Sequence, residues 1–369
     1  MQKDAPHPTF RLPQPLFAMR RFSLALVGLA LLAGTAGCDS GGDGTTASVR
    51  VMTQNLYLGA DLFRVALEPN PQLIPVRVAE LYGSIQASDP AARMGAIAAE
   101  IARVQPDLVG LQEVSTYAIQ MPGDNLPGQA GTPATTVTVD FLDLLMDALA
   151  AEGADYRVVS VSNNADVELP ATTNGTSFFD VRYRDADVIL ARAGVTTGTP
   201  TEQTYRALLT QPVGGVPQTF TRGYQTVSAT VDGLAFTFIN THLEVGGAAE
   251  VIQVQQASEL IPVLSATSGP VILVGDINSD ANAAGTSYQT LTVPLDDAFA
   301  AGTAATCCQA PDLRNAASTL ATRIDVVLTR GFEGSAGGEV VLDAPSDRVG
   351  GLWPSDHAGV WADVEAIVM

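Results

Sequence analysis

The sequence predicts an α/β fold in which two packed β-sheets are flanked by helices. Strand-like apolar runs outnumber helix-like runs along most of the chain, and helices interrupt them only rarely. A doubly wound parallel sheet would instead alternate strands with helices. From residue 48 onward the sequence contains no second polar linker and no internal repeat, so we expect residues 48–369 to form one domain.

The pattern of apolar residues places each element. A helix is predicted over residues 94–104 because Ile97, Ile101 and Val104 share one face, and helices are also expected over residues 141–149 and 248–264. Apolar runs that end in turn or polar residues predict strands over residues 48–55, 108–114, 156–161, 187–191, 225–231, 234–240, 271–275, 323–328 and 359–364. Gly, Pro and Thr predict a loop over residues 119–137, and loop-rich insertions are expected over residues 57–92 and 195–222.

Residues 1–38 predict an export signal. Arg20 and Arg21 precede an apolar run over residues 22–32, and small residues lead to Cys38. This resembles a bacterial lipoprotein signal, although Thr35 stands where such signals usually carry Leu; a plain secretory peptide is the alternative. Residues 1–18 carry no export pattern, which favours Met19 as the start. Residues 39–47 are expected to be a flexible tether, so we expect an exported protein, secreted or bound to the envelope by a lipid on Cys38.

The composition is acidic and poor in cysteine. The chain has 19 Lys and Arg against 39 Asp and Glu, a net charge of −20, and such a surface disfavours nonspecific binding of nucleic acid. After Cys38 the only cysteines are the neighbours Cys307 and Cys308, which either form a disulfide or stay free thiols. With no Cys or His partner close in sequence they make a poor zinc site.

Two histidines occupy the ends of predicted strands. His242 follows the apolar strand at residues 236–239, and His357 directly precedes the strand that begins at Ala358. A strand end is a rigid position from which a side chain can be aimed into a cleft. A single histidine at a strand end is more often structural, but the occurrence of both in this position favours a functional role.

A carboxylate and an amide follow the apolar strand over residues 271–275. Asp276 and Asn278 are two residues apart, so their side chains leave the same face if the extended geometry continues. In that case the carboxylate can take a proton from water while the amide holds a phosphoryl oxygen. The alternative is an ordinary Gly-Asp-x-Asn turn.

Three further polar residues lie in or at the end of apolar strands. Asn55 and Glu113 together form a hard oxygen-ligand set that suits Mg²⁺ or Ca²⁺ better than zinc. Asp325 lies within an apolar strand, and a buried carboxylate requires a partner. His357 is the expected partner, and an ion pair with Arg323 or another arginine is the alternative.

The order of these motifs resembles the endonuclease/exonuclease/phosphatase superfamily, which includes secreted DNases and bacterial sphingomyelinases. The motifs that carry the resemblance are Thr53-Gln54-Asn55, Leu111-Gln112-Glu113-Val114, Asn240-Thr241-His242-Leu243, Gly275-Asp276-Ile277-Asn278, Arg323-Ile324-Asp325 and Ser355-Asp356-His357. The resemblance implies a four-layer α/β/β/α sandwich of two packed, mostly antiparallel sheets, with the site at one end of the sheets.

The resemblance also implies roles for the motif residues. Glu113 would bind Mg²⁺, Mn²⁺ or Ca²⁺ with Asn55 beside it, and Asp356 would support a metal or the histidine pair. Asp276 would activate the attacking water and Asn278 would hold the phosphate. His242 would stabilise charge on the phosphoryl oxygens or assist the leaving group, and Asp325 would orient His357.

One part of the family pattern is not resolved by the sequence. Secreted nucleases carry an acidic partner for the first catalytic histidine in the middle of the chain, where both Glu168 and Asp187 are candidates. The expected function is a metal-dependent phosphodiesterase, of nuclease or sphingomyelinase type, that acts as a monomer on nucleic acid, a phospholipid head group or a small phosphate ester. The alternatives are a phosphomonoesterase and a non-catalytic ligand-binding lipoprotein.

For a nuclease, Arg182, Arg184 and Arg192 are the candidates for a cationic groove. For a lipid substrate, Trp353 is a candidate contact, although packing in the core is the simpler expectation.

Overall fold

The computed structural model describes residues 45–368 except 126–130, 214–215 and 300–303. The predicted export signal, the lipid anchor on Cys38 and most of the predicted tether therefore lie outside the described residues. The last three tether residues belong instead to the first strand, β1 (Thr45–Asn55), where they pair with the end of β17. None of the helices in the described part of the chain combines the length and apolarity that crossing a bilayer requires.

The first sheet contains both ends of the domain. Its strand order is β16-β17-β1-β2-β6-β3-β4, and β5 pairs with β6 outside this path. Only β1 and β2 pair in parallel. Besides β1, its strands are β2 (Leu108–Gln112), β3 (Thr116–Gln120), β4 (Thr136–Asp140), β5 (Tyr156–Ala171), β6 (Phe179–Arg192), β16 (Gly334–Val341) and β17 (Gly359–Val368).

The second sheet has the order β14-β15-β13-β12-β11-β7, with β8 paired to β11. Here β12 and β13 are the parallel pair, and the other pairings are antiparallel. Its strands are β7 (Thr196–Thr197), β8 (Thr201–Thr204), β11 (Gly223–Val231), β12 (Leu234–His242), β13 (Val271–Asp276), β14 (Asp296–Asp297) and β15 (Asp325–Arg330). A separate ribbon is formed by β9 (Leu209–Val213) and β10 (Val216–Phe220).

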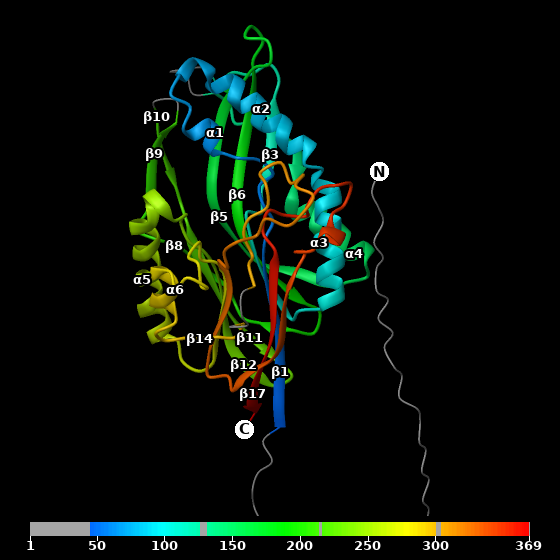
Figure 1. Ribbon diagram of the computed structural model, residues 1–369, viewed down its shortest axis with the longest axis vertical. Coiled ribbons are helices and arrows are strands. Elements are labelled where there is room, and N and C mark those ends of the chain that lie inside the picture. The colour runs from blue at the N-terminus through cyan, green and yellow to red at the C-terminus, as the bar shows by residue number, and fades with distance from the viewer. Residues whose placement is uncertain (1–44, 126–130, 214–215, 300–303, 369) are drawn as a thin grey trace, which may run out of the picture. The chain divides into compact units, whose positions relative to one another are not determined.

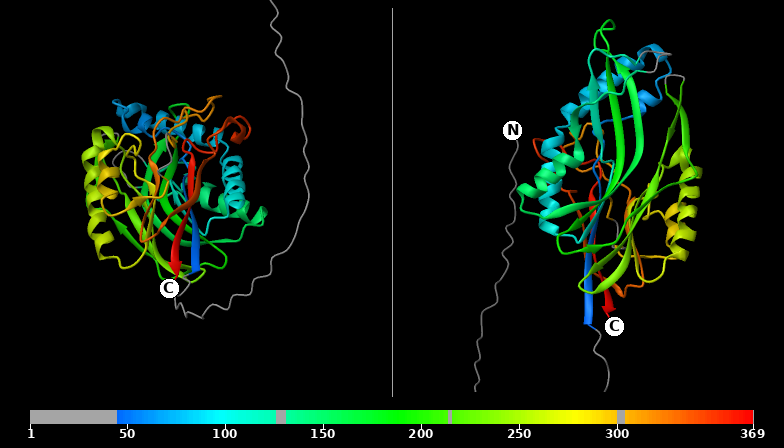
Figure 2. Two further views of the ribbon diagram at one scale, coloured as in Figure 1. Left: turned by 60° about the horizontal axis from the view of Figure 1, so that its bottom comes forward. Right: turned by 180° about the vertical axis from the view of Figure 1, so that it is seen from behind.

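Helices cover the outer faces of both sheets (Figures 1 and 2). The α-helices are α1 (Phe63–Ala66), α2 (Ile74–Ala87), α3 (Pro90–Val104), α4 (Phe141–Ala151), α5 (Glu250–Ala266) and α6 (Thr286–Leu291). Short 3₁₀ helices are η1 (Pro71–Leu73), η2 (Gly247–Ala249) and η3 (Pro345–Asp347).

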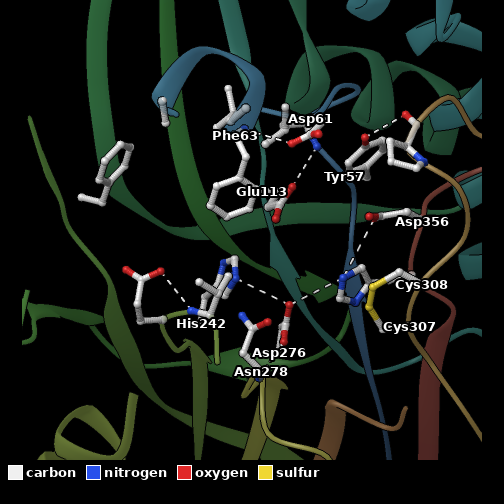
Figure 3. A pocket seen from close by; sticks show the side chains of 18 of the residues that line it. Tyr57, Asp61, Phe63, Glu113, His242, Asp276, Asn278, Cys307, Cys308 and Asp356 are labelled. Carbon is white, nitrogen blue, oxygen red and sulfur yellow. Dashed lines mark hydrogen bonds and ion pairs between the residues drawn. A yellow bond between two sulfur atoms is a disulfide. The ribbon is translucent and has the colours of Figure 1, made fainter. Parts of the chain in front are cut away.

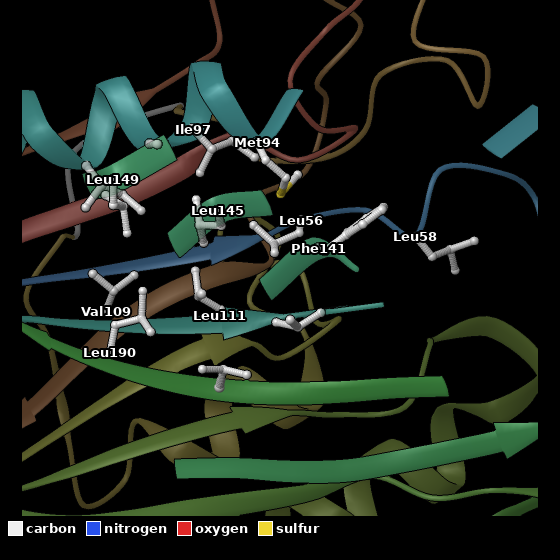
Figure 4. Close-up of a cluster of buried hydrophobic side chains, with 14 of the residues drawn as sticks. Leu56, Leu58, Met94, Ile97, Val109, Leu111, Phe141, Leu145, Leu149 and Leu190 are labelled. Atoms are coloured by element: carbon white, nitrogen blue, oxygen red, sulfur yellow. The ribbon is translucent and has the colours of Figure 1, made fainter. Parts of the chain in front are cut away.

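Three buried apolar clusters lie between four successive layers. One packs α3 and α4 against the first sheet through residues such as Ile97, Leu145 and Leu111 (Figure 4). A second lies between the sheets and includes Val51 and Phe238, and a third packs α5 against the second sheet through Leu260 and Leu273. The layers are thus helix, sheet, sheet and helix, as the α/β sandwich predicted.

Local sequence explains why these elements form. Asp89 caps α3 by accepting a hydrogen bond from the Ala92 backbone, and Pro90 occupies the first turn, where its missing N–H has no cost. In β11 buried residues alternate with more exposed ones, as expected for a strand with one face in the core. In β13 every residue is buried, which matches its uninterrupted apolar run.

The loop predictions were wrong in part. Residues 57–92 contain α1 and the 14-residue helix α2. Pro75 and Gly83 disfavour a helix in the sequence pattern, but Pro75 lies in the first turn of α2, where proline is tolerated. Residues 119–137 include the end of β3 and the start of β4, and residues 195–222 contain β7 to β10. Trp353, with 0% of its surface exposed, packs in the core.

Candidate active site

Three of the predicted catalytic residues lie side by side on one row of the second sheet. His242 at the end of β12 pairs in register with Asp276 on β13, and Asp276 pairs with Asp325 on β15. Gly275 allows the close approach of β12 and β13, because a Cβ at this residue would lie 1.9 Å from the Thr241 carbonyl oxygen and its φ is +149°. The sheet itself therefore fixes the spacing of these three side chains.

Asp276 occupies the centre of the site. Its Oδ2 accepts a hydrogen bond from the Asn55 amide at 3.1 Å and lies 3.5 Å from Nε2 of His242 and 3.8 Å from Nε2 of His357. Its Oδ1 accepts a hydrogen bond from the Asn278 backbone at 2.8 Å. One carboxylate oxygen thus faces both imidazoles, while the other is fixed by the backbone.

His357 is paired with Asp325. Its Nδ1 lies 2.9 Å from Oδ2 of Asp325. Arg323 pairs with Asp297 at 2.6 Å, so the alternative prediction of an ion pair between Arg323 and Asp325 is wrong. Burial alone would lower the pKa of His357, but Asp325, Asp276 and Asp356 outweigh it and raise the pKa well above its ordinary value. The carboxylate at Nδ1 therefore favours the imidazolium form of His357, whose Nε2 faces Asp276.

His242 has two partners at Nδ1. Arg222 donates a hydrogen bond to it at 2.9 Å, and Asp187 lies 3.7 Å away. Burial and Arg222 lower the pKa of His242, but Asp187 and Asp276 together raise it overall. Asp187 is thus the acidic neighbour that the sequence left undecided, because Glu168 instead accepts a hydrogen bond from the Ala134 backbone.

Glu113 and Asp356 line the same pocket as Asp276. Glu113 accepts hydrogen bonds from the Asn55 side chain at 3.3 Å and from the Leu58 backbone at 2.9 Å. Burial raises the pKa of Asp356 to about 7, and its Oδ1 accepts no hydrogen bond from any described residue. The acidic and histidine atoms that converge within 4.8 Å here belong to Asp276, Asp325 and His357 rather than to the predicted ligand set.

Asn55 and Asn278 differ from the sequence expectation. The side-chain oxygen of Asn55 accepts a hydrogen bond from the Tyr57 backbone, so its NH₂ group, and not its oxygen, faces Glu113 and Asp276. Asn278 has a φ of +50°, so the extended geometry of β13 does not continue, and its NH₂ group donates to the Leu243 carbonyl. Both residues hold the site together, and Asn278 also lines the pocket.

The pocket has a volume of about 300 Å³ and two kinds of wall. Figure 3 shows Glu113 and Asp356 facing His242, Asp276 and Asn278 across it. Most of its apolar lining comes from the segment after β1 and from the β9–β10 ribbon, and includes Leu58, Leu62, Phe63, Ala66, Leu209 and Phe220. Cys307 and Cys308, for which the sequence left both states open, are joined by a disulfide at its edge.

Sequence reasoning missed two arginines of the site, the partly buried Arg222 and the fully buried Arg93. Arg222 contacts His242 and lies 4.0 Å from both Asp185 and Glu244. Arg93 donates hydrogen bonds to the backbone carbonyls of Leu56, Tyr57 and Pro354, which joins the two segments that carry Asn55 and His357. No motif marks either residue, although Arg93 interrupts the apolar face of α3, where a charge requires an explanation.

The model of the endonuclease/exonuclease/phosphatase family matches residues 52–357. A search of curated proteins returned no match.

Similar solved structures include two proteins from Bacteroides thetaiotaomicron. One is a member of the same family, with 17% identity, coverage of 88% of this chain and 100% of that chain, and a TM-score of 0.54. The other is a mannosyl-6-phosphatase, with 17% identity, coverage of 86% and 99%, and a TM-score of 0.53.

A family protein from Bacteroides vulgatus has 19% identity, coverage of 87% and 99%, and a TM-score of 0.51. At these identities the similarity shows a shared fold and does not identify a substrate. The family model, in contrast, spans most of the chain and includes all the site residues from Asn55 to His357. The protein therefore belongs to the endonuclease/exonuclease/phosphatase family.

Proposed function

We propose that this protein is a divalent-metal-dependent hydrolase and that its substrate is a phosphodiester. The observation that carries the proposal is the position of Asp276, whose Oδ2 lies 3.5 Å and 3.8 Å from the Nε2 atoms of two buried histidines. A carboxylate between two imidazoles, at the wall of a pocket, can accept a proton from water while N–H donors stabilise the charge on phosphoryl oxygens. The family is one of phosphoester hydrolases, which fits this chemistry.

Each residue of the site has a task in this reaction. Asp276 orients the attacking water and takes its proton, and the Asn278 backbone keeps the carboxylate in place. His357, held as an imidazolium by Asp325, donates Nε2–H to a phosphoryl oxygen. His242 stabilises charge on the phosphoryl group or protonates the leaving oxygen.

The residues present fit a divalent metal ion. Carboxylates outnumber cationic groups around the described site, and the Asp356 Oδ1 atom is buried without a hydrogen-bond partner. Glu113 and Asp356 would hold the ion, and their hard oxygen atoms suit Mg²⁺, Mn²⁺ or Ca²⁺. Asn55 would act by fixing Glu113 through its NH₂ group. A bound ion would supply Lewis-acid stabilisation of charge on the phosphate.

The pocket favours a compact phosphodiester over nucleic acid. Among the candidates for a cationic groove, Arg182 pairs with Asp166, Arg192 pairs with Asp107, and neither these two nor Arg184 lines the pocket. One wall of the pocket is apolar, which suits an apolar group next to the phosphate.

The charges around the pocket favour a diester over a monoester. A diester carries one negative charge, whereas a monoester dianion would bring a second charge toward Glu113, Asp276 and Asp356. The one arginine among the described lining residues, Arg222, already faces Asp185 and Glu244. A phospholipid head group or a small phosphodiester is therefore the proposed substrate class, and export through residues 1–38 remains a prediction consistent with it.

The test is hydrolysis of bis-p-nitrophenyl phosphate and p-nitrophenyl phosphate by the purified protein with Mg²⁺, Mn²⁺ or Ca²⁺. We expect preference for the diester, loss of activity in EDTA and recovery on adding back metal. Glu113→Gln should lower the metal affinity, whereas Glu152→Gln, an exposed residue after α4, should not change it. Full activity after exhaustive chelation would contradict the metal role, and faster monoester hydrolysis would contradict the substrate class.

A further inference from the structure

A second acidic cluster lies far from the catalytic residues in sequence and shares none of their side chains. It consists of Asp124, in the segment that joins β3 to β4, Glu168 on β5 and Asp180 on β6. One carboxylate oxygen from each of the three lies within 4.8 Å of the others. Figure 1 labels β5 and β6, the paired strands to which Glu168 and Asp180 belong.

The protein contacts of this cluster leave ligand atoms available. Oδ2 of Asp180 accepts hydrogen bonds from the backbones of Asp124 and Asn125, at 2.6 Å and 3.0 Å. Glu168 accepts through Oε2 from the Ala134 backbone at 2.8 Å, and the Asp124 carboxylate accepts from Thr132. The second oxygen of Glu168 has no such partner among the described hydrogen bonds.

Asp180 gives the independent observation that points to a ligand. Its side chain is fully buried at 0% exposure, and Oδ1 accepts no hydrogen bond from any residue that the structure describes. A Cβ on Gly123 would lie 2.7 Å from this oxygen, so the loop passes as close to it as glycine permits. An ionised carboxylate oxygen without a donor is costly to bury, and two neighbouring carboxylates make it costlier.

Among the described residues, no arginine donates a hydrogen bond to the cluster. Arg182 is the cross-strand neighbour of Glu168 and adds a favourable charge there, but its two hydrogen bonds to a carboxylate, of 2.6 Å and 2.5 Å, both go to Asp166. The possible ligand atoms of the cluster are carboxylate oxygens from one loop and two strands. Such an irregular arrangement suits the flexible coordination of Ca²⁺ better than the strict octahedron of Mg²⁺. Soft metals are disfavoured because the cluster offers neither sulfur nor imidazole.

We propose that Asp124, Glu168 and Asp180 bind a Ca²⁺ ion that fastens the β3–β4 segment to the β5–β6 hairpin. This site is separate from the catalytic metal site and has a structural role. Its occupancy neutralises the repulsion between the three carboxylates and ties Asp124 to two strands of the first sheet. Ca²⁺ binding is therefore expected to raise the thermal stability of the folded chain without taking part in hydrolysis.

The experiment measures Ca²⁺ binding by calorimetry, and the melting temperature with and without Ca²⁺, on chelated full-length protein. All variants carry Glu113→Gln, so that the catalytic metal site contributes little. We expect saturating Ca²⁺ to raise the melting temperature by roughly 2 °C or more. Asp180→Asn and Glu168→Gln should each weaken Ca²⁺ binding at least tenfold and remove this increase.

A matched control separates the cluster from general acidity. Glu152→Gln changes an exposed carboxylate after α4 that is not part of the cluster, and it should leave Ca²⁺ binding unchanged. Without Ca²⁺, Glu168→Gln should be at least as stable as its parent, because repulsion is relieved while Gln can still accept from Ala134. Ca²⁺ should then stabilise the parent and not Glu168→Gln, and this difference distinguishes ion binding from a change in the metal-free fold.

Two outcomes would overturn the proposal. An equal Ca²⁺-dependent increase in the parent, Asp180→Asn and Glu168→Gln would place the ion elsewhere. Absence of Ca²⁺ binding in the Glu113→Gln parent would mean that the carboxylates share a proton instead. Neither outcome bears on hydrolysis, so the proposed function would stand or fall separately.

Discussion

The two histidines of the site have opposite surroundings at Nδ1. In the His357 corner, Nδ1 faces one group, the Asp325 carboxylate at 2.9 Å. In the His242 corner, Nδ1 receives a hydrogen bond from Arg222 at 2.9 Å, and the Asp187 carboxylate lies further away at 3.7 Å. Both Nε2 atoms face the same oxygen of Asp276.

The pKa of both imidazoles is raised, but the groups at Nδ1 act in opposite directions at His242 and in one direction at His357. A carboxylate at Nδ1 requires an N–H there and favours the imidazolium, whereas a guanidinium is a donor only and requires the lone pair. The surroundings of His357 therefore favour its charged form. The charge of His242 depends on a competition between Arg222, which lowers its pKa, and the carboxylates of Asp187 and Asp276, which raise it.

The largest effect is expected at Asp276, which faces both histidines. Asp276→Ala removes the carboxylate that faces both histidines, and kcat should fall by at least roughly a hundredfold. The melting temperature should change little, because the substitution removes one of several crowded negative charges. Asp107→Ala is the matched control, since Asp107 is a buried carboxylate paired with Arg192 away from the pocket. The Asp107→Ala variant should lose stability and retain kcat. A folded Asp276→Ala protein with normal turnover would contradict the role of Asp276 as the general base.

A double-mutant cycle tests the difference between the corners directly. His357→Ala should lower kcat by roughly a hundredfold and Asp325→Asn by about tenfold or more. The double variant should resemble His357→Ala alone, because the carboxylate has nothing left to orient. The matching cycle of His242→Ala with Asp187→Asn should be closer to additive. In the Asp187→Asn single variant Arg222 still holds Nδ1 of His242, so this carboxylate matters less for the orientation of the ring. Equal coupling in both cycles would mean that Asp187 orients His242 as strongly as Asp325 orients His357.

The smallest effect is a shift in the titration of His242. Arg222→Gln removes a group that lowers the pKa of His242, so the imidazole should retain its proton to higher pH. Asp187→Asn removes a group that raises this pKa, so the proton should be lost at lower pH. NMR of the ring nitrogens can follow both, because the chain has only three histidines. Asp276 also faces the ring and is kept in both variants.

Arg192→Gln provides the control for this titration. Arg192 pairs with Asp107 and does not line the pocket, so the titration of His242 should not move. Shifts of the same sign in Arg222→Gln and Asp187→Asn would show that the competition at Nδ1 does not set the protonation of His242.

The strand ends of this fold were predictable from sequence, whereas the side-chain directions beyond them were not. The apolar run over residues 271–275 marked β13, and Asp276 follows from it because a polar residue at the end of a buried strand is conspicuous. Burial of Asp325 implied a partner, and the structure provides His357. These inferences rest on strand periodicity and on the cost of burying a charge, which are local properties of the sequence.

Other features depend on tertiary contacts that leave no local trace. Arg222 lies directly before β11 in a segment predicted to be a loop, and only the pairing of β11 with β12 brings it to His242. The direction of the Asn55 amide is set by the Tyr57 backbone, where the chain has left β1. The choice between Glu168 and Asp187 depended on how far β5 and β6 extend, and both strands are longer than their apolar cores suggested.

The common row of His242, Asp276 and Asp325 has a consequence for how the protein inactivates. These residues lie where the hydrogen-bonded ladders of β12, β13 and β15 end, and paired strands in a core are among the last parts of a protein to open. Glu113 and Asp356, in contrast, lie in segments outside the strands. Backbone amides inside these three strands should therefore exchange with solvent deuterium more slowly than those of the segments that carry Glu113 and Asp356. On heating, the row of three side chains should outlast the opposite wall of the pocket.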